Sequence, residues 1–227
     1  LPLVRKKISM EEQAAKKSII EVRDNGVKRR IGVISLPTFY QDFAARQRGD
    51  KDFKSATRDV ARLLGELKKD KVDNVLIDLR NNGGGSLIEA VDLTGLFIDK
   101  GPVVMQRNAE GKVDIESDNN AGLAWDGPMG VLINRGSASA SEIFAAAIQD
   151  YGRGVIIGEG SFGKGTVQTL FNLDRFGGSE KARFGELKMT IAQFFRINGG
   201  TTQLRGVTPD IKLPAMSHTE NFGESSY

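Results

Sequence analysis

Two side chains in this sequence have the types needed for nucleophilic catalysis without a histidine base. Ser139 lies in the segment SASASE (137–142), and Lys164 follows 25 residues later in FGKGT (162–166). A lysine held in apolar surroundings loses solvation of its ammonium group, and its pKa falls from about 10.4 toward neutrality. Because the neutral amine can accept a proton from a serine hydroxyl, the pair could activate a serine for attack on a carbonyl carbon.

Other candidates for the general base are poor. The one histidine, His218, lies in a polar C-terminal stretch that we expect to be a tail, and the chain has no cysteine. Asp150 could complete a triad, but it lies eleven residues after Ser139 along an expected helix, a rise of about 16 Å. We therefore expect Asp150 to cap or brace the helix end near Tyr151 and Arg153, and the chemistry to depend on a serine–lysine pair.

Each candidate also has a structural interpretation. The pattern Ser139-x-x-Glu142 matches a capping box at the start of an apolar helix. A serine at a strand-to-helix turn also lies beside the free amides of a helix N-terminus, which can stabilise an oxyanion. The run Gly83-Gly84-Gly85 predicts either a turn with positive φ or a second set of amides that approach a reacting carbonyl.

The lysine segment has two further interpretations. Residues 158–164 match the G-x-x-x-x-G-K pattern of a phosphate-binding loop, but Gly165 stands where that loop needs a serine or threonine. A strand, rather than a helix, is expected after Lys164, which argues against nucleotide binding. The lysine could also be a surface residue in a glycine turn. Gln168 could hold the lysine through its amide, although an extended strand would separate the two Cα atoms by about 13 Å.

The composition is that of an ordinary globular protein. Of 227 residues, 39% are hydrophobic and 27% are charged, and the net charge is only +3, so nucleic acid is not an expected partner. No apolar run approaches the roughly 18 residues of a transmembrane helix. The lack of cysteine is compatible with an oxidising compartment. Because the chain opens on Leu1 with no signal-like stretch, we expect a processed or excised piece of a longer protein.

Strands and helices are expected to alternate through the middle of the chain, with antiparallel strands at both ends, which predicts an α/β domain. Residues 1–18 are charged and helix-compatible, and Asn25-Gly26 predicts a hairpin. Residues 174–183 are expected to form a flexible loop and residues 217–227 a loose tail. Helices are expected at 53–67, 87–97 and 140–151, and strands at 18–22, 31–36, 72–79, 103–105, 113–115, 129–134, 155–157, 167–171 and 186–195.

Several ordered motifs together resemble one family. Between about residues 1 and 214 the sequence contains, in order, LVRKKI, IDLRNNGGG, SASASEIFAAAIQDYGR, IGE, FGKGTVQ, FFRINGG and GVTPDI. Their combination resembles the carboxy-terminal processing peptidases, the serine peptidases of family S41, and most of all the bacterial tail-specific members. The resemblance implies a ClpP/crotonase-like ββα core with additional antiparallel strands, consistent with the α/β class expected from the order of segments.

The resemblance also implies a serine endopeptidase that forms an acyl-enzyme and needs no metal or cofactor. The implied catalytic residues are the nucleophile, the general base, the residue that orients the base and a supporting carboxylate: Ser139, Lys164, Gln168 and Asp150. The implied oxyanion donors are the amides of Gly85 and Ala140, with Gly84 as a substitute for Gly85.

The expected organisation has three parts. Residues 1–30 are a strand/helix segment that leads from a PDZ domain not contained in the chain, residues 31–216 are the S41 protease core, and residues 217–227 are a C-terminal tail. The resemblance implies substrates with nonpolar C-termini, that PDZ domain and an adaptor or regulatory protein as partners, and a location in the bacterial periplasm or cell envelope. Two alternatives stay open: a catalytically silent protein-binding scaffold of the same fold, and a crotonase-like acyl-transfer enzyme.

Overall fold

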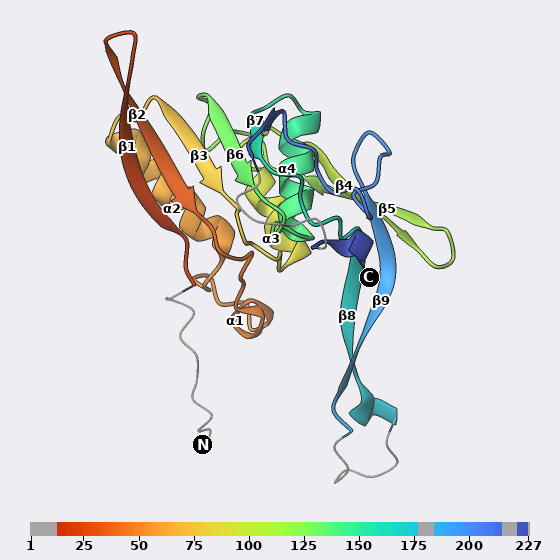
Figure 1. Ribbon diagram of the computed structural model, residues 1–227. Helices are drawn as coiled ribbons and strands as arrows, with labels where there is room; N and C mark the ends of the chain where they lie inside the picture. The colour runs from red at the N-terminus through yellow and green to blue at the C-terminus, as the bar shows by residue number, and fades with distance from the viewer. Residues whose placement is uncertain (1–12, 177–183, 215–221, 227) are drawn as a thin grey trace, which may run out of the picture.

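Within the residues that the computed structural model describes (13–176, 184–214 and 222–226), a six-stranded sheet forms the centre of the fold (Figure 1). Strand β1 is antiparallel to β2, and the strands from β2 to β10 run parallel. The strand order is β1 (Lys16–Asp24), β2 (Val27–Ser35), β3 (Asn74–Asp78), β6 (Met129–Ile133), β7 (Val155–Gly158) and β10 (Ile211–Lys212).

Helices cover one face of this sheet (Figure 1). Their apolar side chains and those of the central strands form one buried core, which is why these strands are rich in apolar residues. They are α2 (Ala56–Lys69), α3 (Leu87–Thr94) and α4 (Ala140–Asp150). Gly32 in β2 makes room for α2, since a Cβ there would lie 2.8 Å from the Leu67 side chain. Residues 140–148 of α4 are all buried. Because close-packed cores deform little, α4 gives rigid support to the turn at its N-terminus.

The carboxyl ends of β3, β6 and β7 meet at one edge of the sheet because these strands are parallel neighbours. Three loops leave this edge, and they contain the glycine run (79–86), the serine segment (134–139) and the lysine segment (159–165). In open α/β sheets, ligand sites form at this carboxyl edge. The topology therefore collects three motifs that are far apart in the sequence.

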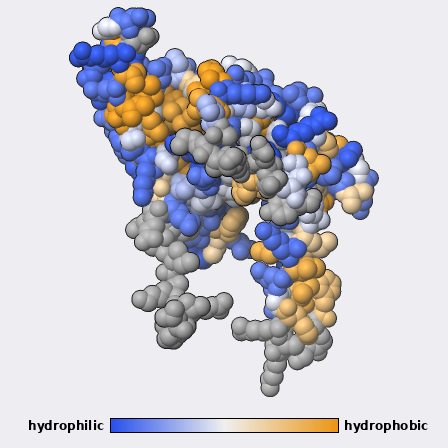
Figure 2. Space-filling model, in the orientation of Figure 1, coloured by the Kyte–Doolittle hydropathy of each residue, from blue (hydrophilic) through white to orange (hydrophobic). Residues whose placement is uncertain are grey.

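A second sheet of four strands, counted within the described residues, has the order β5 (Val113–Asp118), β4 (Gly101–Asn108), β9 (Glu186–Phe195) and β8 (Thr166–Asn172). Strands β8 and β9 continue beyond it as a two-stranded arm that projects from the body of the protein (Figure 1). Figure 2 shows apolar side chains along this arm. They include Leu170, Phe171, Phe176, Leu187 and Met189. Strand β8 begins two residues after Lys164, so the arm continues directly from the lysine segment.

Most expected elements are present. The hairpin at Asn25-Gly26 is confirmed, and both residues have the positive φ, 49° and 80°, that a tight hairpin turn needs. Residues 16–18 belong to β1, so the helix-compatible interpretation is wrong there, and residues 1–12 lie outside the described part of the chain. The sequence pattern does not predict α1 (Phe43–Gln47) or β10, which are too short to show a period.

The ends of two expected loops are ordered. Leu173–Phe176 form a 3-10 turn, η1, while residues 177–183 lie outside the described residues. The expectation of a loose tail is wrong for residues 222–226, which include the turn η2 (Glu224–Ser226) and pack on the protein. His218 lies outside the described residues. None of the described helices is long and apolar enough to cross a membrane.

Candidate active site

Ser139 occupies the turn between β6 and α4 in a conformation that is uncommon for a residue with a side chain. Its φ is 57° and its ψ is −112°, and it is the N-cap of α4. Such a backbone conformation costs about 1–3 kcal/mol and persists only where surrounding contacts impose it. The Ala138 N–H donates to the Asn82 carbonyl at 3.0 Å, and the Ile143 N–H donates to the Ser139 carbonyl at 3.0 Å. The turn is therefore fixed on both sides of the candidate nucleophile.

Glu142 joins the serine turn to the lysine loop through one carboxylate. It is fully buried in the first turn of α4, and its Oε2 accepts the N–H of Ser139 at 2.8 Å and the N–H of Lys164 at 2.9 Å. Its Oε1 accepts the Ser161 hydroxyl at 2.6 Å and the Gly163 N–H at 2.7 Å. Because the backbone nitrogens of Ser139 and Lys164 bond to the same oxygen atom, their separation cannot exceed the sum of the two hydrogen-bond lengths. This carboxylate thus brings the two candidate catalytic residues together.

The capping box expected from Ser139 and Glu142 is also present. Its well-formed arm is the bond from the Ser139 N–H to the carboxylate. The reciprocal arm to the serine hydroxyl is looser, because the Glu142 N–H donates to the Ser139 carbonyl oxygen at 2.9 Å. Burial raises the pKa of Glu142 to about 7, while the hydrogen bonds that its carboxylate accepts lower it. The capping and the catalytic interpretations are therefore compatible, and the shared group titrates near neutral pH.

The lysine loop is tied to the serine segment and carries its own amide partner. The Phe162 N–H donates to the Ser137 carbonyl at 2.9 Å. Lys164 is half-buried, and its Nζ lies 3.5 Å from Oε1 of Gln168, at the outer limit of a hydrogen bond. Strand β8, rather than a helix, follows the loop, as expected. The segment therefore lacks the helix N-terminus with which a phosphate-binding loop holds its ligand.

The glycine run lies against the serine turn. A Cβ on Gly84 would lie 2.9 Å from the Cβ of Ser139 and 3.0 Å from the nitrogen of Ala140, so only glycine fits. The Gly84 N–H donates to the Asn82 side chain at 2.9 Å, which makes it a poor substitute oxyanion donor. The N–H groups of Gly85 and Ala140 find no acceptor among the described residues. Of the three expected oxyanion donors, Gly85 and Ala140 are therefore the two whose amides are available to a ligand.

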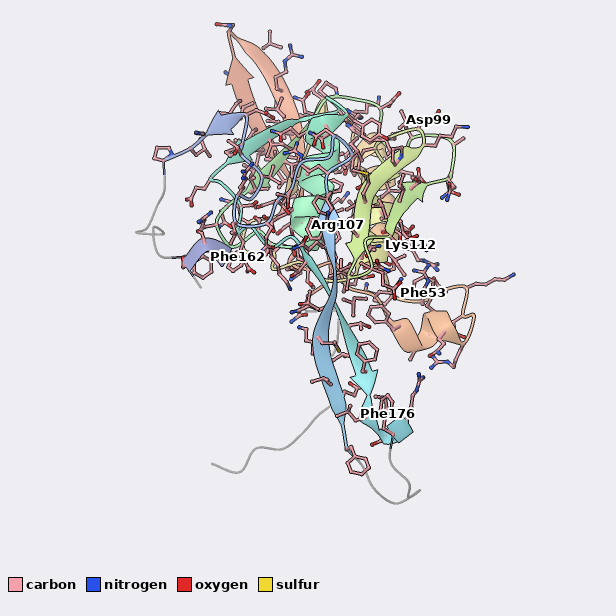
Figure 3. The ribbon with its side chains drawn as sticks, turned by 90° about the vertical axis from the view of Figure 1, so that its right-hand side faces the viewer. Phe53, Asp99, Arg107, Lys112, Phe162 and Phe176 are labelled. Atoms are coloured by element: carbon pink, nitrogen blue, oxygen red, sulfur yellow. The ribbon has the colours of Figure 1, made fainter. Side chains whose placement is uncertain are left out.

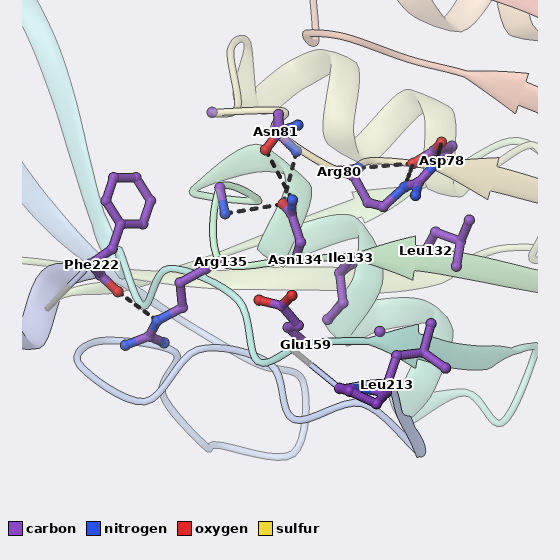
Figure 4. Close-up of a pocket in the computed structure, with 14 residues that line it drawn as sticks. Asp78, Arg80, Asn81, Leu132, Ile133, Asn134, Arg135, Glu159, Leu213 and Phe222 are labelled. Carbon is purple, nitrogen blue, oxygen red and sulfur yellow. Dashed lines mark hydrogen bonds and ion pairs between the residues drawn. The ribbon is translucent and has the colours of Figure 1, made fainter. Parts of the chain in front are cut away.

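A cavity of 1140 Å³ opens beside these loops at the carboxyl ends of β3, β6 and β7 (Figure 4). In its wall, the Asn81 N–H donates to Oδ1 of Asn134 at 2.8 Å, and Nδ2 of Asn134 donates to Oδ1 of Asn81 at 2.9 Å. This pair ties the glycine loop to the serine loop. Neither Ser139 nor Lys164 lines the cavity, which therefore lies beside the site and not in it.

Asp150 lies at the far end of α4, away from Ser139, as the helix length predicts. Its carboxylate accepts two hydrogen bonds from the Arg196 guanidinium, at 2.6 and 3.0 Å, and one from the Asn198 side chain at 2.8 Å. The Asp150 side chain is 7% exposed. Since Arg196 directly follows β9, the ion pair braces the end of that strand against α4. The brace therefore runs to another element and is not confined to the helix end near Tyr151 and Arg153.

Replacing Asp150 with alanine is expected to lower the free energy of unfolding by about 3–5 kcal/mol, because it leaves the Arg196 guanidinium largely buried without its carboxylate. Asp150→Asn keeps the shape and one acceptor and should cost less. Denaturant titration in the Ser139→Ala background measures both without self-cleavage. A loss below about 1 kcal/mol for Asp150→Ala would show that the pair is not a brace.

The chain is similar to known proteins over most of its length. The family model described as "Peptidase family S41" matches residues 30–213. The tail-specific protease of Haemophilus influenzae is 44% identical over 99% of this chain and 30% of its own length. The chloroplastic carboxyl-terminal-processing peptidase 2 of Arabidopsis thaliana is 32% identical over 94% of this chain and 38% of its own length. The chain thus spans about a third of the length of these relatives.

Solved structures show the same architecture. The photosystem II D1 C-terminal processing protease aligns with a TM-score of 0.70 at 30% identity, over 94% of this chain and 51% of that chain. Mature CPAF, at 17% identity, shares the fold with a TM-score of 0.67 over 93% of this chain and 52% of that one. The expected mixed α/β fold of the S41 peptidases is confirmed. Since the family model covers most of the sequence, the chain belongs to peptidase family S41.

Proposed function

We propose that this chain is the catalytic part of a tail-specific serine endopeptidase, with Ser139 as nucleophile and Lys164 as general base. The observation that carries the proposal is the shared Oε2 of Glu142, which holds the backbone of both residues at the N-terminus of α4. The lysine is half-buried and within reach of the Gln168 amide, which we propose orients it. A serine and a base held in this way are the parts that nucleophilic catalysis needs.

The proposed reaction has two stages. The neutral amine of Lys164 takes the proton of the Ser139 hydroxyl while its oxygen attacks the peptide carbonyl carbon. The lysine then gives that proton to the leaving amine as the peptide C–N bond breaks, which leaves an ester on the serine. In the second stage water loses a proton to the lysine, attacks the ester carbon and releases the new C-terminal carboxylic acid, while the lysine returns its proton to the serine oxygen. The acid then loses its own proton to solvent and becomes the carboxylate.

The oxyanion of each tetrahedral intermediate needs preorganised donors. We propose the N–H groups of Gly85 and Ala140 for this role, because neither has an acceptor among the described residues. The Ala140 N–H is one of the amides that a helix leaves free at its N-terminus, where the helix dipole favours negative charge. Removal of one such donor in other hydrolases lowers kcat by about 10²–10³-fold.

The proposed substrates are proteins with nonpolar C-termini, in an envelope or periplasmic location. The names of the relatives, tail-specific protease and carboxyl-terminal-processing peptidase, support the choice of C-terminal regions. The exposed apolar arm that continues from the lysine loop is a surface suited to nonpolar chains. A PDZ domain and an adaptor or regulatory protein are proposed as the partners that deliver substrate. The lack of cysteine is compatible with an oxidising compartment.

A pair of matched substrates tests this function. An unfolded protein that ends in nonpolar residues should be cleaved about tenfold faster or more than the same protein with a charged end. Ser139→Ala provides the background rate. Equal rates for the two ends would remove the proposed tail specificity and leave the chemistry standing. Substrate that is bound but never cleaved, even with a PDZ domain added in trans, would favour the scaffold alternative.

The rate of cleavage is expected to rise between about pH 6 and pH 9, because a lysine base acts only as the neutral amine. The measurement is kcat/KM for a short peptide whose own groups do not titrate in this range. A rate that falls steadily over the same interval would contradict a lysine base.

A further inference from the structure

The ordered C-terminal residues 222–226 lie on the loop that carries Lys164. The Phe222 ring packs edge-on against the Phe162 ring at 5.7 Å, and the Glu224 N–H donates to the Phe162 carbonyl at 3.0 Å. Figure 3 shows Phe162 beside this turn. A Cβ on Gly223 would lie 3.1 Å from the same carbonyl oxygen, so the chain crosses the loop in close contact. Phe162 is two residues from Lys164, and residues 222–224 therefore contact the lysine loop directly.

Arg135 fixes the other side of this segment. It belongs to the serine loop, and its Nη1 donates to the Ser161 carbonyl at 2.7 Å. Its Nε donates to the Phe222 carbonyl at 2.6 Å (Figure 4). One guanidinium thus joins the serine loop, the lysine loop and the C-terminal segment. Since Arg presents several donors in a rigid fork, it holds the three backbones in a fixed relation.

Gln203 completes the connection on the far side of the lysine. Its Oε1 accepts the Gly165 N–H at 2.7 Å, and its Nε2 donates to Oε1 of Glu224 at 3.2 Å. The backbone of the lysine loop is therefore held at Phe162, before Lys164, and at Gly165, after it. The C-terminal segment takes part in both attachments.

We propose that residues 222–224 form a strap that positions the Lys164 amine for proton transfer, an inference that rests on the proposed role of this lysine. The strap touches no reacting atom and acts through Phe162 and Gly165. A displacement of about 1 Å in a reacting group can lower a rate by about 10²-fold. Releasing the strap should therefore lower kcat strongly and change the KM for substrate only a little.

A donor–acceptor swap tests the strap. Gln203→Glu keeps an acceptor for the Gly165 N–H but removes the donor to Glu224 and places two carboxylates together, so kcat should fall about tenfold with little change in KM. Glu224→Gln keeps an acceptor for Gln203 and should fall less than about threefold. The double variant restores the bond in the opposite sense and should recover to within about threefold of wild type.

Hydrogen exchange of the amides in residues 161–165 gives a readout that needs no proteolysis. We expect faster exchange in Gln203→Glu, recovery in the double variant, and unchanged melting temperatures throughout. Phe222→Ala should also speed this exchange, whereas Phe176→Ala, which removes a phenyl group from η1 on the projecting arm, should not.

Unchanged exchange and kcat in Gln203→Glu, a rise in kcat, or a double variant no better than the single would each overturn the strap. A rise would identify an inhibitory contact instead. If the wild type cleaves nothing even with a PDZ domain added in trans, the proposed function fails, and the exchange measurement still decides whether the strap holds the loop.

Discussion

Lys164→Ala is expected to lower kcat for peptide cleavage by about 10⁴-fold or more, with the chain still folded. Without the amine, the hydroxyl of Ser139 keeps its proton in the attacking step, and the leaving amine receives none. Lys164→Arg is the matched control, because an arginine keeps the length and charge but stays protonated and cannot serve as a base. It should be as inactive as the alanine variant.

Ser139→Ala should cause a loss of the same size, and the double variant should be no worse than either single variant. Groups that act as one unit in catalysis are strongly non-additive in this way. Steady-state kinetics of the four proteins on one peptide measures the cycle, with circular dichroism as the check on folding. Additive losses, or a Lys164→Arg variant that keeps more than about a tenth of the activity, would contradict the serine–lysine pair.

Glu142→Gln is expected to produce the second largest loss, about 10²-fold in kcat or more. The amide of a glutamine has one acceptor oxygen where the carboxylate has two. Its NH₂ group would face N–H or O–H donors that now bond to a carboxylate oxygen, so those hydrogen bonds would be lost. The Ser139 turn and the Lys164 loop then lose their shared anchor. Glu89→Gln is the matched control, because Glu89 is equally buried and accepts hydrogen bonds from Gln41, Ser55 and Thr57, outside the candidate site. It should lower stability without this loss of activity.

The free energy of unfolding is expected to depend on pH through the titration of Glu142. Its pKa is about 7 in the folded protein against an ordinary value of 4.5, because burial disfavours the carboxylate. The stabilisation from this group is therefore fully present below about pH 4.5 and lost as the pH rises through about 7, a change of roughly 3 kcal/mol. The free energy of unfolding of wild type, relative to Glu142→Gln, should fall over that window.

Activity should move in the opposite direction over the same pH range. Only the ionised carboxylate can accept hydrogen bonds on both oxygens from both loops, so the kcat of wild type should rise through about pH 7 with a limb that Glu142→Gln lacks. Identical pH profiles for the two proteins below about pH 8 would show that Glu142 does not control the site through its charge.

The sequence could predict the elements of the site better than their connections. The apolar runs of the central strands, the Asn25-Gly26 turn and the serine before an apolar helix each have a local signature, and each is confirmed. The capping pattern singles out Glu142 as a partner of Ser139. Its bonds to Ser161, Gly163 and Lys164 span about twenty residues and depend on how β6 and β7 pair, which no local pattern contains.

The same reason explains where the expectations were incomplete. Helix length correctly moved Asp150 away from the nucleophile, but its partner Arg196 lies beyond a strand of the second sheet. The polar sequence at the C-terminal end predicts a loose tail, whereas residues 222–224 dock mainly through backbone groups and one phenyl ring, with the Glu224 carboxylate bound to Gln203. Backbone hydrogen bonds carry no residue signature, so composition could not indicate this contact.

Lys164, and no histidine, is expected to activate Ser139. The most direct test is labelling with a fluorophosphonate, in which the serine oxygen displaces fluoride at phosphorus and keeps the phosphonyl group. Mass spectrometry should find the adduct on the peptide containing Ser139 in wild type and in His218→Ala at equal rates, and labelling should slow by at least about 10²-fold in Lys164→Ala. Equal labelling of Lys164→Ala, or loss of labelling in His218→Ala, would contradict the account.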